Sequence, residues 1–164
     1  NKLSELFLNL YTPETLGGQG RSRFVKQHSV CHEDAFRYLL QAEAKRSQRS
    51  GQGYHILLIY RSEAQGSITP MHAYVAAVVL DALAQSLRET DYIGWYREGH
   101  IIGGVLTVVG QDSIADVVKR VQHYLKDVLR AKLGLEESRC FHLRLCQQHE
   151  LQKFDSGILT MTVQ

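Results

Sequence analysis

The chain has little proline and cysteine, and it has no long apolar run. Its 164 residues include 2 prolines and 3 cysteines, and 19 lysines and arginines stand against 17 aspartates and glutamates. Three cysteines are too few for a disulfide-stapled secreted scaffold, so a reducing cytoplasm is the expected setting. No apolar stretch approaches the roughly 20 residues that a membrane-spanning helix needs. The near-neutral charge also excludes a strongly basic nucleic-acid module, so we expect neither nucleic-acid nor membrane contact.

The remaining composition, 44% hydrophobic and 22% charged, predicts one folded domain with a substantial core. The chain starts at Asn1 without an initiating Met or a signal-peptide pattern, which indicates a segment of a longer protein. We expect residues 1–33 to form an N-terminal helix and a linker, because an apolar stripe near the start is followed by Gly17-Gly18-Gln19-Gly20. Residues 34–164 are expected to form the domain itself.

The hydrophobic periodicity of the domain alternates between helical and strand spacing. The helical patterns cover residues 34–49, 70–88 and 114–129, the last with Asp112 or Ser113 as its cap. The strand patterns cover residues 55–60, 92–96, 101–109 and 141–146, with a hairpin turn at 97–100 and one more candidate strand at 158–163.

From residue 55 onward, the core order is therefore strand, helix, strand, strand, helix, strand. This order is typical of the α+β class with a ferredoxin-like, split βαβ core. We expect an antiparallel sheet with two helices packed on one of its faces.

Three stretches resemble the GGDEF domains of bacterial diguanylate cyclases. Residues 36–60 are similar to the first helix and first strand of that family. Residues 83–91 resemble the end of its second helix, where many members carry an Arg-x-x-Asp motif, here Arg88-Glu89-Thr90-Asp91. Tyr92-Ile93-Gly94-Trp95-Tyr96 resembles the strand that leads into the hairpin turn after which the family is named. The resemblance implies the GGDEF fold and a setting in cyclic-di-GMP signalling.

The resemblance also indicates that catalysis is lost. Family members hold two magnesium ions with an aspartate at the end of the first strand, where this chain has Tyr60, and with an acidic residue in the turn. The turn reads Arg97-Glu98-Gly99-His100, which places the acidic position on Gly99 or, with a slip of one residue, on Glu98 or His100. The helix position that contacts guanine in the family falls on about Ala73.

A phenol does not replace a carboxylate as a ligand for a hard cation, and a single Glu98 forms no metal cage. Because phosphoryl transfer depends on metal ions that neutralise phosphate charge, we expect a degenerate domain that is not an enzyme. No catalytic residue, no metal site and no cofactor is expected.

The retained Arg-x-x-Asp pattern indicates a binding site. In the family it is an inhibitory site for cyclic-di-GMP, in which the arginine grips phosphate and guanine and the aspartate accepts from the guanine edge. On this resemblance Arg88 and Asp91 would bind the ligand, with Arg120 or His123 of the next helix as the second contact. The alternative is structural, because an arginine suits the C-terminal end of a helix and an aspartate can open the next strand.

Other residue clusters are better explained by structure than by chemistry. One set of metal-ligating side chains matches no standard zinc-finger spacing: His28, Cys31 and His32. A second set is better explained as solvent-facing or partly buried residues of a strand: Cys140, His142 and Cys146. The aromatic residues of the expected hairpin, Tyr92, Trp95 and Tyr96, suit a core or a dimer contact.

These observations favour a catalytically inactive GGDEF-like regulatory or sensory domain of a larger bacterial protein, with exopolysaccharide or biofilm regulation as its setting. Its expected partners are cyclic-di-GMP and the other domains of the parent protein. The alternative is a ligand-free scaffold that docks another protein or forms a homodimer. An active diguanylate cyclase is the least favoured function.

Overall fold

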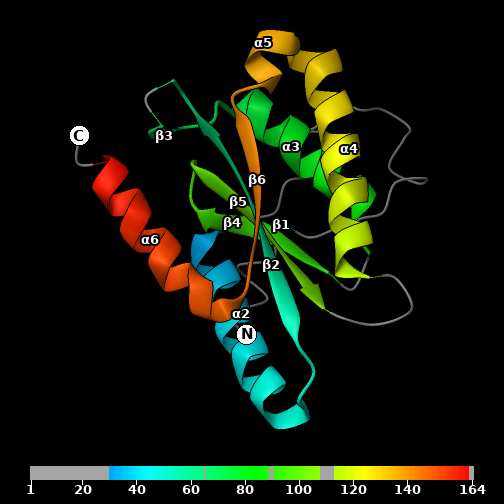
Figure 1. Cartoon of the computed structure of the whole chain (residues 1–164), viewed down its shortest axis with the longest axis vertical. Coiled ribbons are helices and arrows are strands. Elements are labelled where there is room, and N and C mark those ends of the chain that lie inside the picture. Colours follow the sequence, from blue (N-terminus) through cyan, green and yellow to red (C-terminus); the bar gives the residue numbers. More distant parts are fainter. Residues whose placement is uncertain (1–29, 65, 89–90, 108–112, 163–164) are drawn as a thin grey trace.

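The computed structural model describes residues 30–64, 66–88, 91–107 and 113–162 (Figure 1). The expected N-terminal helix and most of the linker therefore lie outside the described residues. The described strands are β1 (Val30–Cys31), β2 (Tyr54–Ser62), β3 (Ile68–Thr69), β4 (Tyr92–Arg97), β5 (Ile101–Thr107) and β6 (Phe141–Cys146). The described helices are α2 (Glu33–Ser50), α3 (Ala73–Ser86), α4 (Ile114–Leu133), α5 (Leu135–Ser138) and α6 (Gln148–Thr162).

The strands form one six-stranded sheet in the order β1-β4-β5-β2-β3, and β6 also pairs with β2. The elements β2, α3, β4, β5, α4 and β6 follow one another as the split βαβ order requires, so the α+β prediction is confirmed. The four strands of this core pair antiparallel as expected, and the short strand β1, which the sequence did not predict, adds a parallel pairing with β4 and makes the sheet mixed. Val30 and Cys31 thus belong to the sheet, ahead of the boundary expected at residue 34.

The two expected core helices, α3 and α4, cover one face of the sheet, and α2 and α6 cover the other face, which the sequence did not predict (Figure 1). On one face, Leu57 and Ile59 of β2 pack in a core with α3 and α4. On the other face, Ile56 and Leu58 pack in a second core with α2 and α6. Because β2 is covered on both sides, its sequence reads as an unbroken apolar run rather than as an alternating one.

The strand expected at residues 158–163 is wrong, because α6 runs through this segment as far as Thr162. The described side chains of α6 show why this part of the chain forms a helix. Leu151 and Phe154, three residues apart, are 6% and 7% exposed and lie in the second core. Residues at this spacing share one face of a helix, so burial of that face on the sheet outweighs the strand propensity of the later residues.

The start of α4 resolves the choice between two expected caps. The Ser113 hydroxyl accepts a hydrogen bond from the Asp116 backbone N–H at 3.2 Å, as an N-cap serine does.

Among the described residues, no helix combines the length and the apolar character needed to cross a bilayer.

Candidate functional site

The structure brings the end of β2, the start of α3 and the β4–β5 turn together at one end of the sheet. Tyr60 pairs with Ile101, the first residue after the turn. The Met71 backbone N–H donates to the Gly99 carbonyl oxygen at 2.8 Å, and Ala73 begins α3 two residues later. The positions that the resemblance assigns to the metal ions and to guanine are therefore neighbours in space.

Tyr60 lies in an aromatic cluster and not among carboxylates. Its ring centroid is 5.8 Å from that of Phe154 on α6 and 5.4 Å from that of His142 on β6. Such separations are typical of tilted aromatic packing. Tyr60, which the resemblance aligns with a metal-binding aspartate, thus makes an apolar contact between the sheet and its last helix.

Glu98, the carboxylate of the turn, is bound to the start of α2. Its Oε1 accepts from the Glu33 backbone N–H at 3.1 Å, and its own backbone N–H donates to Glu33 Oε1 at 2.7 Å. Its Oε2 lies 3.4 Å from His32 Nδ1. A carboxylate suits a helix N-terminus, where backbone N–H groups lack partners. Glu98 therefore acts as a cap that ties the turn to α2.

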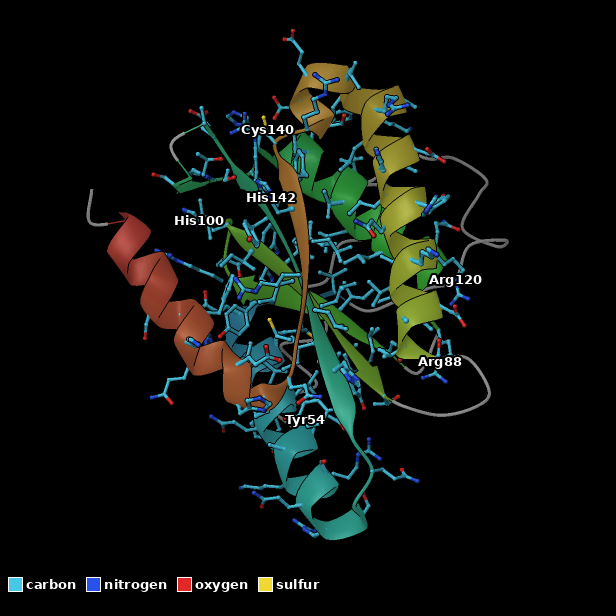
Figure 2. The ribbon with its side chains drawn as sticks, viewed as in Figure 1. Tyr54, Arg88, His100, Arg120, Cys140 and His142 are labelled. Atoms are coloured by element: carbon cyan, nitrogen blue, oxygen red, sulfur yellow. The ribbon has the colours of Figure 1, made fainter. Side chains whose placement is uncertain are left out.

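The other two candidate positions in the turn offer no carboxylate. Gly99 has a φ of 77°, in the left-handed region that favours glycine. His100 donates from Nδ1 to the Glu98 carbonyl oxygen at 3.0 Å and lies at the end of the sheet (Figure 2). Across the residues that the structure describes, no three histidine, cysteine, aspartate or glutamate side chains are grouped so that they would hold a metal ion.

Arg88 and Asp91, the second candidate site, bind each other and the end of β5. The Asp91 side chain is 2% exposed, and its Oδ2 accepts from the Arg88 backbone N–H at 3.0 Å. Its Oδ1 accepts from the Thr107 backbone N–H at 3.4 Å and from the Arg88 guanidinium at 3.4 Å. The guanidinium also donates to the Thr107 carbonyl oxygen. Asp91 therefore joins the end of α3 to the end of β5.

Arg88, unlike Asp91, has a partly exposed side chain. Its side chain is 39% exposed. Arg120 and His123 of α4, the expected second contacts, are exposed, and Figure 2 shows Arg88 and Arg120 on the same flank of the molecule, beside α4. A planar guanidinium binds phosphate and purine edges through two parallel hydrogen bonds. The chemistry of this flank therefore suits an anion.

The described cysteines and histidines of the two other clusters belong to no group of three side chains that could hold a metal ion. Cys31 of β1 is 1% exposed, and burial raises the pKa of its thiol to about 12. Cys140 directly precedes β6 and Cys146 is its last residue, and burial raises the pKa of Cys146 as well. His28 lies outside the described residues. Of the hairpin aromatics, Trp95 and Tyr96 are each 2% exposed and belong to the core.

Two sets of contacts around the first site were missed by sequence reasoning. Arg61, at the end of β2, donates to Glu137 of α5 at 2.5 Å and to Thr69 Oγ1 at 2.8 Å. The hydrogen bond from Arg61 lowers the pKa of Glu137. On the opposite face, the Tyr96 hydroxyl donates to the Asp155 carboxylate of α6 at 2.8 Å, and burial together with that carboxylate raises the pKa of Tyr96. The spacing of Leu151 and Phe154 was the one signal that α6 packs here.

No protein-family model and no curated protein matches the chain. Solved structures do match it. A DGC protein from Thermotoga maritima is 15% identical, with a TM-score of 0.58 over 80% of this chain and 95% of that one. A sensory box/GGDEF family protein from Caulobacter crescentus is 14% identical, with a TM-score of 0.49 over 82% of this chain and 94% of that one. A GGDEF domain from Pseudomonas aeruginosa is 16% identical, with a TM-score of 0.48 over 73% of each chain.

At these identities the likeness is one of fold, and function has to be argued from the site. The chain has a GGDEF-like fold.

Proposed function

We propose that this chain is a GGDEF-like regulatory domain without cyclase activity, which works in the bacterial cytoplasm with other domains of its parent protein. The observation that carries the proposal is the packing of Phe154 on Tyr60, with ring centroids 5.8 Å apart. Because the resemblance aligns Tyr60 with the metal-binding aspartate, this aromatic contact supports the proposal. Glu98, bound to the N-terminus of α2, supplies no replacement ligand. Regulation of exopolysaccharide production is the setting that the resemblance suggests.

The first prediction is that the domain does not convert GTP to cyclic-di-GMP. Loss of the metal ions removes several kcal/mol of transition-state stabilisation, so its rate should be at least about 10³-fold below that of an active GGDEF cyclase assayed alongside. The measurement is product formation from GTP with magnesium, separated by chromatography. Glu98→Ala should leave this background unchanged. Magnesium-dependent product that disappears in Glu98→Ala would contradict the proposal.

The regulatory signal that we propose is cyclic-di-GMP, bound at Arg88. The partly exposed Arg88 side chain, whose guanidinium is held by Asp91 and the Thr107 carbonyl oxygen, supports this choice. In this arrangement Arg88 supplies the contact to phosphate, with Arg120 or His123 of α4 as its second contact. Asp91, whose oxygens already accept backbone hydrogen bonds, holds Arg88 in place.

The second prediction is that cyclic-di-GMP binds the protein and that Arg88→Ala weakens it. A hydrogen bond to a charged group contributes about 1.5–3 kcal/mol, so the dissociation constant should rise about ten- to a hundredfold. Isothermal titration calorimetry measures this dissociation constant. The matched control is Lys132→Ala, which removes an exposed cation farther along α4. Absence of heat with the unaltered protein would contradict this prediction and favour the ligand-free scaffold.

A further inference from the structure

A cavity of about 400 Å³ lies between α4, α5 and β6. Figure 1 shows α4 and α5 on one side of β6, with α6 on the other side. Leu125 and Leu129 of α4 contribute buried side chains to the cavity, and Phe141 of β6 is partly buried there. The volume is within the range of small-molecule sites, which is about 300–1,000 Å³. The cavity therefore has the size and the apolar floor of a ligand site.

Three cations surround this apolar floor, and no acidic residue lines it. Lys126 and Arg130 come from α4 and Arg139 follows α5, and all three are exposed. None of the ion pairs between described residues involves them. Glu137, an acidic residue of α5 close to Arg139 in sequence, is paired with Arg61 on β2. The rim is therefore positively charged without internal compensation from described side chains.

Two of these cations repel each other. Lys126 and Arg130 are four residues apart, so they are neighbours on one face of α4, and like charges at this spacing destabilise a helix. An anion bound between them would remove this repulsion. Leu135, which also lines the cavity, is 45% exposed, so an apolar surface lies open beside the charges. An exposed apolar surface beside a charged rim is the complement of an amphipathic molecule.

We infer that this cavity binds a small, soluble amphipathic anion, a compound with a phosphate or carboxylate group on an apolar body. The apolar body lies on Leu125, Leu129 and Phe141, and the anionic group lies between Lys126, Arg130 and Arg139. A second copy of the chain is a poor occupant, because symmetric pairing would bring the same cations together. This site is separate from Arg88 and does not depend on cyclic-di-GMP binding.

The test uses hexyl phosphate as the probe, titrated into the protein by calorimetry. Inorganic phosphate has the charge without the apolar body, and hexanol has the apolar body without the charge. We expect hexyl phosphate to bind with a millimolar or lower dissociation constant, at least tenfold more tightly than either fragment. The double variant Lys126→Gln and Arg130→Gln should weaken binding at least tenfold. The control Lys132→Gln removes an α4 cation that does not line the cavity and should change nothing.

Two further variants test whether hexyl phosphate binds in this cavity and not elsewhere on the protein. Leu135→Asp places a carboxylate at a half-exposed position of the cavity, so it should abolish binding even if the double variant is unstable. Arg88→Ala should bind hexyl phosphate as the unaltered protein does, which separates this site from the one proposed for cyclic-di-GMP. Equal binding of hexanol, unchanged binding in Leu135→Asp, or binding only to vesicles of phosphatidylglycerol would overturn the inference.

Discussion

Replacing Phe36 by alanine is expected to lower the free energy of unfolding by about 3–5 kcal/mol, as deletion of a buried aromatic ring does. Phe36 of α2 is 0% exposed and belongs to the core that covers the α2 and α6 face of the sheet. A Cβ atom added to Gly103 of β5 would lie 2.8 Å from its Cε2 and Cζ atoms. The ring therefore packs directly on the backbone of the sheet. Urea unfolding followed by circular dichroism measures the loss.

A double-mutant cycle identifies this contact specifically. Gly103→Ala alone overpacks the ring and should cost about 1–3 kcal/mol. In a Phe36→Leu background the methyl group added at Gly103 has more room. The double variant should therefore lose less free energy of unfolding than the sum of the two single losses, by at least about 0.5 kcal/mol. Gly53→Ala, where an added Cβ meets nothing within 4 Å, is the matched control and should be close to neutral. Strictly additive losses would show that Phe36 and Gly103 do not touch.

The sequence predicted Phe36 as part of an apolar helical stripe but not its partner. The stripe follows from the 3.6-residue period, and the central strand β2 follows from its short apolar run. The contact with Gly103 depends on the register of β5 and on which face of the sheet α2 covers. Both are set by tertiary packing, so local pattern does not contain them.

The difference between local sequence pattern and tertiary packing also explains why the contacts of Tyr60 and Glu98 were not predicted. Tyr60 and the turn could be named because the resemblance aligns them with the family. The partner of Tyr60, Phe154, comes from α6, whose later residues have strand propensity and were expected to form a strand. The bonds between Glu98 and Glu33 join residues 65 positions apart, a separation at which single-sequence patterns carry no signal. β1 has only two residues, too few for any periodicity.

Replacing Asp91 by alanine is expected to lower the free energy of unfolding by about 2–4 kcal/mol. The carboxylate is 2% exposed and accepts hydrogen bonds from the backbone N–H groups of Arg88 and Thr107. Each buried donor that loses its acceptor costs about 1–3 kcal/mol. Asp91→Asn, which keeps one acceptor oxygen, should lose less. Asp127→Ala, an exposed aspartate of α4, is the control and should stay within about 0.5 kcal/mol of the unaltered protein.

Comparison with Arg88→Ala separates the two roles within the Arg-x-x-Asp pattern. Arg88→Ala keeps the backbone N–H that donates to Asp91, and its side chain is 39% exposed, so it should destabilise by less than about half of the Asp91→Ala loss. Its main effect should instead be on the binding of cyclic-di-GMP. An Asp91→Ala protein that unfolds at the urea midpoint of the unaltered chain would show that Asp91 does not hold α3 to β5. The Asp91 carboxylate would then be available to a ligand. The proposal that Asp91 holds the structure while Arg88 binds the ligand would be wrong.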